Sequence, residues 1–188
     1  LSATQMQAML RVAFRLNADL DSAYKHVNNQ LAEDLPDDRF ITAFMGFLNP
    51  RTHCVEYHSG GQGPILHFHA SDGACDWHKP TSFPVGIMDI DAEQESASLQ
   101  LEPGDILGLI SDGVYEYANL AGEEFGEERV AALFRKNHHL PMANLSELLI
   151  RAAMEFGGDA PQADDITMVL VRRLTQSEAA SNAVGGTE

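Results

Sequence analysis

Two aspartate positions in this sequence have the residue types and the spacing that metal chemistry needs. Asp112 follows an apolar run at residues 106–111, and the pair Asp164-Asp165 opens the apolar run at residues 166–171. Near-continuous apolar runs of this length are typical of buried strands, so we expect both positions at strand ends. Carboxylate oxygens are the hard ligands that Mg²⁺ and Mn²⁺ prefer. Converging strand ends would therefore build a divalent-metal site.

A purely structural interpretation of the same aspartates stays open at this point. The pair Asp112-Gly113 is a common turn sequence, and Asp164 could cap a turn while Asp165 faces solvent. Spacing alone does not separate the two interpretations, because turns and metal sites place the same residue type at the end of a strand.

Three other stretches are weaker candidates for a metal or nucleotide site. His67 and His69 share one face of a predicted strand and could bind a transition metal, but without a third ligand nearby we interpret them as a solvated strand face. The acidic loop at residues 89–95 lacks the glycine and the twelfth-position glutamate of a calcium loop. The glycine-rich stretch at residues 59–64 contains neither GxGxxG nor GK[ST], so no nucleotide site is expected there.

The two cysteines do not indicate covalent catalysis or a disulfide framework. Cys54 and Cys75 lie far apart, neither is in a CxxC pair, and neither lies in a reactive-looking loop with basic helpers. No Ser-His-Asp arrangement is indicated either. We expect reduced thiols.

The rest of the chain predicts the elements that position these residues. Apolar residues at helical spacing predict helices, and apolar-rich runs bounded by turn residues predict strands. The predicted helices cover residues 4–16, 20–31, 127–136 and 145–156, and the predicted strands cover residues 40–48, 53–58, 65–70, 74–78, 96–101, 106–111 and 166–171. Helices followed by antiparallel strands, helices and a last strand indicate the α+β class, with helices covering a sheet sandwich.

Three details of this prediction concern pairing and helix ends. The strands at residues 96–101 and 106–111 read as antiparallel neighbours across a tight turn at residues 102–105. The strand at residues 166–171 is apolar nearly throughout, which favours a central position in its sheet. Gly157 is placed to stop the preceding helix.

Composition limits the class of protein and its partners. The 188 residues, 44% of them hydrophobic, fit one globular domain, with residues 175–188 as a disordered tail. The 12 basic and 28 acidic residues give a net charge of −16, which would repel nucleic acid. No run is long enough to span a membrane and no signal peptide is visible, so we expect a cytoplasmic protein without a membrane partner.

Seven short motifs follow one another in an order that is more specific than any one of them. They are FIT at residues 40–42, SGGQGP at 59–64, PVGI at 84–87, LEPGD at 101–105, SDGVYE at 111–116, EFG at 124–126 and DDIT at 164–167. This order resembles the bacterial SpoIIE/RsbU branch of the PPM, or 2C-type, metal-dependent protein phosphatases. The resemblance covers residues 1–174.

The resemblance implies a fold, a cofactor and a set of site residues. The fold is an αββα sandwich, in which two packed antiparallel sheets are flanked by helices and hold two Mn²⁺ or Mg²⁺ ions at one edge. Asp112 corresponds to the metal ligand of the T/S-D-G motif and Asp164 to that of the D-D/N-x-T/S motif, so both are the implied catalytic residues. Asp165 is the third implied metal-site residue. The ions would activate water for attack on phosphoserine or phosphothreonine.

The sequence also departs from the pattern of this family. An upstream G-D-x-x-G-H/K-G segment, whose aspartate bridges both metals, does not occur in the 188 residues, and Gln62 stands where the family often has histidine. We expect the upstream segment and its strands to be missing from this chain, which then binds metal weakly and turns over little or no substrate. A degenerate, non-catalytic domain that binds a regulatory partner is the alternative.

The resemblance also implies partners. The expected substrate is a phosphorylated protein, typically an anti-sigma-factor antagonist. An upstream sensory or receiver domain would regulate the activity, and a homodimer is one compatible assembly.

Overall fold

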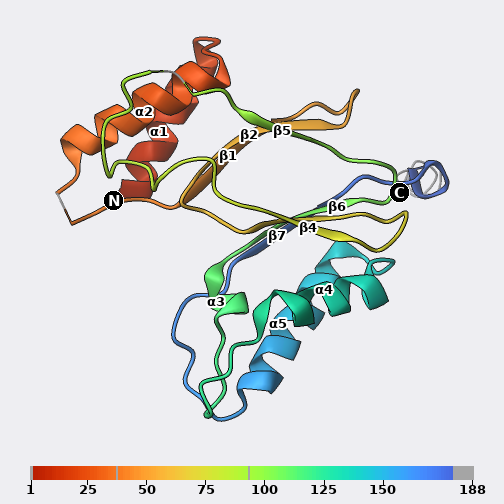
Figure 1. Cartoon of the computed structure of the whole chain (residues 1–188). Helices are drawn as coiled ribbons and strands as arrows, with labels where there is room; N and C mark the ends of the chain where they lie inside the picture. The colour runs from red at the N-terminus through yellow and green to blue at the C-terminus, as the bar shows by residue number, and fades with distance from the viewer. Residues whose placement is uncertain (1, 37, 93, 180–188) are drawn as a thin grey trace, which may run out of the picture. The chain divides into compact units, whose positions relative to one another are not determined.

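The computed structural model describes residues 2–36, 38–92 and 94–179, which form helices and antiparallel strands (Figure 1). In chain order the elements are α1 (Ser2–Arg15), α2 (Leu20–Asp34), β1 (Ala43–Leu48), β2 (Cys54–Gly60), β3 (Ile65–Phe68), β4 (Cys75–His78), β5 (Ala97–Gln100), β6 (Ile106–Ile110), α3 (Asp112–Tyr115), α4 (Gly126–Asn137), α5 (Met142–Gly157) and β7 (Met168–Arg172). Two antiparallel sheets with flanking helices confirm the predicted α+β class. The chain divides into two compact units.

The first unit comprises the residues up to 62 together with residues 80–100. Its sheet has the order β1-β2-β5, and β1 and β2 form the predicted hairpin. Helix α2 begins at Leu20 because the side chain of Asp19 accepts a hydrogen bond from the Ser22 amide at 2.9 Å. Both helices contribute apolar side chains to one core with β1, made by Met6, Leu20, Tyr24, Val27, Leu31, Met45 and Val85.

The second unit comprises residues 63–79 and the residues from 101 onward, and it contains every predicted site residue. Its sheet has the order β4-β3-β6-β7, with β3 and β4 forming the second predicted hairpin. Helices α4 and α5 cover one face of this sheet (Figure 1). Apolar side chains of β3 and β6 belong to the same core as side chains of these helices. The fully buried members of this core include Leu66, Phe68, Ile106, Ile110, Phe134, Leu145 and Leu149.

The predicted pairing of residues 96–101 with residues 106–111 is wrong. Strand β5 pairs with β2 in the first unit, whereas β6 lies between β3 and β7 in the second. The tight turn at residues 102–105 does form, but Asp105 at its end accepts hydrogen bonds from the amides of both Glu102 and Ala70. This carboxylate ties the turn to the end of β3, so the chain leaves one sheet and enters the other.

The last strand is not central, contrary to the prediction. Strand β7 lies at the edge of its sheet and pairs only with β6 among the described strands. Its apolar sequence has another cause: Met168 and Leu170 pack against the core under the helices, while Val169 is 49% exposed. An edge strand with one face covered by helices carries apolar residues on that face, so its sequence resembles that of a central strand.

The stop signal of α5 lies one residue later than predicted. Gly157 is the last helical residue, and Gly158 is the cap with a φ of 58°, the left-handed conformation that glycine adopts most easily. Gly157 is instead required by packing, because a Cβ there would overlap the ring of Tyr117.

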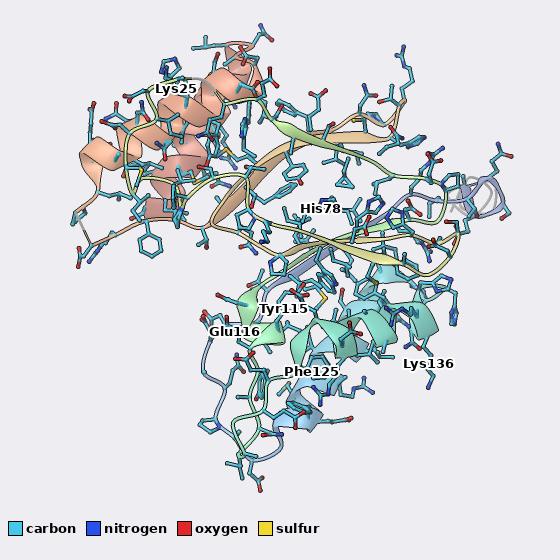
Figure 2. The ribbon with its side chains drawn as sticks, viewed as in Figure 1. Lys25, His78, Tyr115, Glu116, Phe125 and Lys136 are labelled. Atoms are coloured by element: carbon cyan, nitrogen blue, oxygen red, sulfur yellow. The ribbon has the colours of Figure 1, made fainter. Side chains whose placement is uncertain are left out.

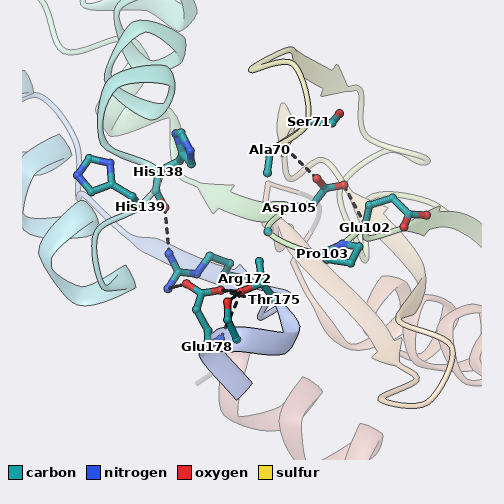
Figure 3. A pocket seen from close by; sticks show the side chains of 12 residues that line it. Ala70, Ser71, Glu102, Pro103, Asp105, His138, His139, Arg172, Thr175 and Glu178 are labelled. Carbon is teal, nitrogen blue, oxygen red and sulfur yellow. Dashed lines mark hydrogen bonds and ion pairs between the residues drawn. The ribbon is translucent and has the colours of Figure 1, made fainter. Parts of the chain in front are cut away.

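Part of the predicted tail makes hydrogen bonds. The amide and hydroxyl of Thr175 donate to the Glu178 carboxylate at 2.9 and 2.8 Å, and Glu178 forms an ion pair with Arg172 at 3.1 Å (Figure 3). The remainder of the predicted tail, residues 180–188, lies outside the described residues. Within the described part of the chain, no helix is both long and apolar enough to cross a membrane.

Candidate metal site

Asp112 lies where strand β6 ends and the one-turn helix α3 begins. The strand is buried along most of its length, and Gly113, Val114 and Tyr115 continue the buried segment, while the Asp112 side chain itself is exposed. The ring of Tyr115 packs edge-on against Trp77 with 5.6 Å between ring centroids, and burial raises the pKa of Tyr115. The predicted turn is thus a helical turn anchored in the core, and it presents a carboxylate to solvent from a rigid base.

Ser111 connects this turn to the segment that precedes β7. Its amide donates to the Thr167 carbonyl at 2.9 Å, and its hydroxyl donates to the Asp165 carbonyl at 3.0 Å and accepts from the Thr167 amide at 2.9 Å. Gly113 completes the contact, since a Cβ there would overlap the carbonyl oxygen of Asp165. The backbones that carry Asp112 and Asp164-Asp165 therefore lie against each other.

The carboxylates themselves are less closely gathered than their backbones. Asp164 Oδ1 accepts a hydrogen bond from the Asp165 amide at 2.7 Å, and Asp112 Oδ1 accepts from the Gly113 amide at 3.0 Å. All three aspartate side chains are exposed. In the described part of the chain, they do not form a set of three ligand atoms within 4.8 Å of one another. Their chemistry fits Mg²⁺ or Mn²⁺, because each aspartate offers at least one oxygen to an ion that keeps several waters.

Glu116 is a further carboxylate beside Asp112, and it lies within the SDGVYE motif at residues 111–116. It is four residues after Asp112, and its amide donates to the Asp112 carbonyl at 2.8 Å, so the helical turn puts both residues on one side. Glu116 lines a cavity of about 460 Å³ together with Asp112, and a smaller one of about 70 Å³ together with Asp164. Figure 2 labels Glu116 beside Tyr115 at the short helix α3.

The larger cavity has a strongly acidic lining. Its lining residues are Gly63, Pro64, Asp112, Tyr115, Glu116, Glu124, Phe125, Gly126, Glu127, Glu128 and Arg129. Arg129 is the one basic residue of this lining, and it is already engaged: it donates to the Glu124 and Phe125 carbonyls, pairs with Glu123 and lies 4.4 Å from the centroid of the Phe156 ring. Such a cavity repels a phosphate group unless cations first neutralise its carboxylates.

The interpretation of His67 and His69 as a solvated strand face without a third ligand is wrong. His67 is only 6% exposed, and its Nε2 lies 3.0 Å from the Asp105 carboxylate. His67, His69 and Asp105 are the one group among the described residues whose ligand atoms all lie within 4.8 Å of one another. Only strand pairing brings Asp105 to the end of β3, so the spacing of the histidines carried no sign of it.

Comparison with known proteins adds information that the geometry does not contain. The sequence profile of the family described as Stage II sporulation protein E (SpoIIE) matches residues 1–174. No curated protein sequence matches the chain significantly.

Solved structures of low sequence identity share the fold. The SiaA-PP2C domain of Pseudomonas aeruginosa has a TM-score of 0.74 at 19% identity and covers 91% of this chain and 67% of its own. The PP2C phosphatase domain of SpoIIE from Bacillus subtilis, with a regulatory fragment, has a TM-score of 0.73 at 20% identity, with coverage of 91% and 49%. The RsbU and RsbW domains of a Mycobacterium tuberculosis protein have a TM-score of 0.71 at 18% identity, with coverage of 98% and 53%. The chain spans about half the length of the last two structures.

Proposed function

This chain belongs to the SpoIIE family, and from that premise we propose that it is the catalytic domain of a Mn²⁺- or Mg²⁺-dependent protein serine/threonine phosphatase. The observation that supports the proposal most strongly is the contact between two loops of the second unit. Ser111 and Gly113 hold the turn of Asp112 against the backbone of Asp165, so two carboxylate-bearing segments meet at one end of the sheet. A surface that only bound a partner would have no chemical need for this arrangement.

We assign different roles to the residues at this site. Asp112 and Asp164 would hold the ions, with Asp165 and Glu116 beside them as further carboxylates. The ions, when bound, supply positive charge for the phosphoryl oxygens and lower the pKa of a water molecule so that it can attack phosphorus in line with the leaving Ser or Thr oxygen. The acidic lining of the larger cavity would exclude phosphate until the ions are present. Arg129, held by two carbonyls, would stay outside the reaction.

We infer the substrate class from the family branch. A phosphorylated serine or threonine of an anti-sigma-factor antagonist is the proposed substrate, and an upstream sensory or receiver segment is the proposed regulator. Recognition would be of a folded phosphoprotein, because the carboxylates lie on an exposed edge where a protein surface can reach them.

One observation favours a second function. The 188 residues contain no G-D-x-x-G-H/K-G segment, and the three aspartate side chains do not converge within 4.8 Å in the described part of the chain. A domain of this kind could bind a regulatory partner without catalysis. The presence of both Asp112 and Asp164 argues for the phosphatase, with the 188 residues alone binding metal weakly and turning over little or no substrate.

The test uses the product of the full coding sequence beside the 188 residues alone. We expect the full product to hydrolyse an aryl phosphate with Mn²⁺, and we expect Asp112→Asn and Asp164→Asn each to reduce turnover at least about 100-fold, because a metal ligand is lost. Asp159→Asn, an exposed aspartate on the neighbouring loop, is the matched control and should keep full activity. An inert parent, or turnover unchanged in both ligand variants, would refute the phosphatase proposal and favour the binding domain.

A further inference from the structure

A second cluster of metal-ligand side chains lies at the opposite end of β6 from Asp112. Nε2 of His67 is 3.0 Å from Oδ2 of Asp105, and Nδ1 of His69 is 3.7 Å from the same oxygen. The rings of the two histidines are 4.0 Å apart between centroids. Three electron-pair donors thus converge on one point of the second unit.

The sheet holds these donors in place. His67 lies within β3, opposite Asp76 of β4 on one side and Leu107 of β6 on the other, and His69 follows two residues later on the same face. Asp105 is 1% exposed, and its other contacts are with the amides of Ala70 and Glu102 at 2.9 and 3.0 Å (Figure 3). Because every donor sits in or beside a paired strand, the arrangement is preorganised.

The hydrogen bond of His69 to Asp76 determines which of its nitrogens can act as a ligand. His69 Nε2 lies 2.9 Å from Asp76 Oδ2, and an ionised carboxylate can only accept a hydrogen bond. In the neutral ring the proton is then on Nε2, and the lone pair of Nδ1 faces the Asp105 carboxylate. Two acceptors that face each other repel unless a cation lies between them. A carboxylate that receives the outer N–H of a metal-binding histidine is the usual support of such sites.

We propose that His67 Nε2, His69 Nδ1 and Asp105 Oδ2 form a binding site for a transition-metal ion of the Zn²⁺ class, separate from the oxygen-only site at Asp112. Ligand atoms about 2.0–2.1 Å from a tetrahedral Zn²⁺ lie roughly 3.3 Å from each other, and the two distances to Asp105 Oδ2, 3.0 and 3.7 Å, bracket that value. Imidazole nitrogen selects Zn²⁺, Co²⁺, Ni²⁺ or Cu²⁺ over Mg²⁺.

The surroundings of the cluster support this assignment. His67 is 6% exposed, so a metal ion bound at its Nε2 would be largely shielded from solvent. A further histidine ring is close, since the centroids of His67 and His78 are 6.3 Å apart. Nε2 of His78 is buried and has no hydrogen-bond partner among the described residues, which is rare for a buried polar atom. Water would complete four-fold coordination.

The competing explanation is a metal-free hydrogen-bonded cluster. In that case Asp105 serves only to accept the turn amides and one proton from His67, and His69 is held by Asp76 alone. The two explanations differ in whether a soft or borderline metal binds with defined stoichiometry at these residues.

The test is a Co²⁺ titration of the 188-residue chain with millimolar Mg²⁺ present to occupy the oxygen-only site, followed by displacement with Zn²⁺. We expect one equivalent of Co²⁺ to give the intense visible absorption of a four-coordinate site, and Zn²⁺ to abolish it. His69→Gln should weaken binding at least about 100-fold because a ligand is lost. Asp76→Asn should weaken it about 10- to 100-fold through the orientation of His69. Both side chains are partly exposed, so neither variant should unfold the protein, which circular dichroism would check.

Two controls separate this site from others. His139→Gln removes an exposed histidine and should leave Co²⁺ binding unchanged, and Asp112→Asn should do the same. Absence of the visible absorption, or equal loss of binding in the His69→Gln and His139→Gln variants, would overturn the proposal. Neither result would bear on the phosphatase proposal, which depends on Asp112 and Asp164.

Discussion

The two ends of strand β6 carry aspartates with opposite environments. Asp105, before the strand, is 1% exposed and has the Ala70 and Glu102 amides and the His67 ring within hydrogen-bonding distance. Asp112, after the strand, is exposed, and its side chain accepts a hydrogen bond from the amide of the next residue. A buried carboxylate is stable only when donors surround it, whereas an exposed one keeps lone pairs for ligands. The first aspartate therefore stabilises the fold as well as contributing to the proposed transition-metal site, whereas the second keeps its oxygens available for the oxygen-only metal site.

Asp105→Ala should have the largest effect on stability of the substitutions that test the difference between Asp105 and Asp112. The substitution leaves the amides of Ala70 and Glu102 and the buried His67 ring without their acceptor, and the free energy of unfolding should fall by about 3–5 kcal/mol. Urea unfolding followed by circular dichroism measures the loss. Asp112→Ala is the matched control, and as a surface change it should stay within about 0.5 kcal/mol of the parent. Equal losses in the two variants would remove the distinction between the two ends.

Gly113→Ala should show that the end at Asp112 depends on close backbone contact. A Cβ would overlap the Asp165 carbonyl, a backbone atom that cannot rotate away, so we expect a loss of about 1–3 kcal/mol. Mn²⁺ affinity should fall with it, because the two aspartate loops are forced apart. Gly108→Ala in the middle of β6 is the comparison, since its Cβ would approach only side-chain atoms, at 3.3–3.5 Å. A larger loss at Gly108 than at Gly113 would contradict this explanation.

The same contrast explains how much of the molecule could be predicted from sequence. The spacing of apolar residues and the positions of turn residues were enough to predict helices α1, α2, α4 and α5, the two hairpins and the strand that leads to Asp112. These elements depend on residues close together in the chain. The aspartates at strand ends were visible for the same reason. That their loops touch depends on Ser111 and Gly113, whose role appears only when β6 and β7 pair.

What could not be predicted depends on long-range pairing. Strands β5 and β6 flank one turn and look like a hairpin, yet the partners of Asp105 commit them to different sheets. Strand β7 looks central because helix α5 covers the face that carries Met168 and Leu170. His67 was predicted to be exposed because the residues near it in the sequence do not indicate that Asp105 will lie beside it.

Ser111→Ala should have a smaller effect than either change above. It removes the hydroxyl that donates to the Asp165 carbonyl and accepts from the Thr167 amide, while the backbone bond to Thr167 stays. We expect a loss of about 1 kcal/mol in urea unfolding. Ser71→Ala, at an exposed serine in the turn after β3, should change stability by less than half of that. Equal effects at the two serines would mean that Ser111 does not join the loops.

Asp112→Asn should have the smallest effect on the metal-free protein and the clearest effect on the metal-bound one. Without metal, its unfolding free energy should stay within about 0.5 kcal/mol of the parent, because the amide keeps the size of the side chain and the group is exposed. With Mn²⁺ added to the product of the full coding sequence, the parent should melt at a higher temperature, since a ligand that binds only the folded state stabilises it by mass action. The variant should lose most of that shift, whereas Asp159→Asn should keep it. A variant that is destabilised without metal and still protected by Mn²⁺ would show that Asp112, like Asp105, serves the fold.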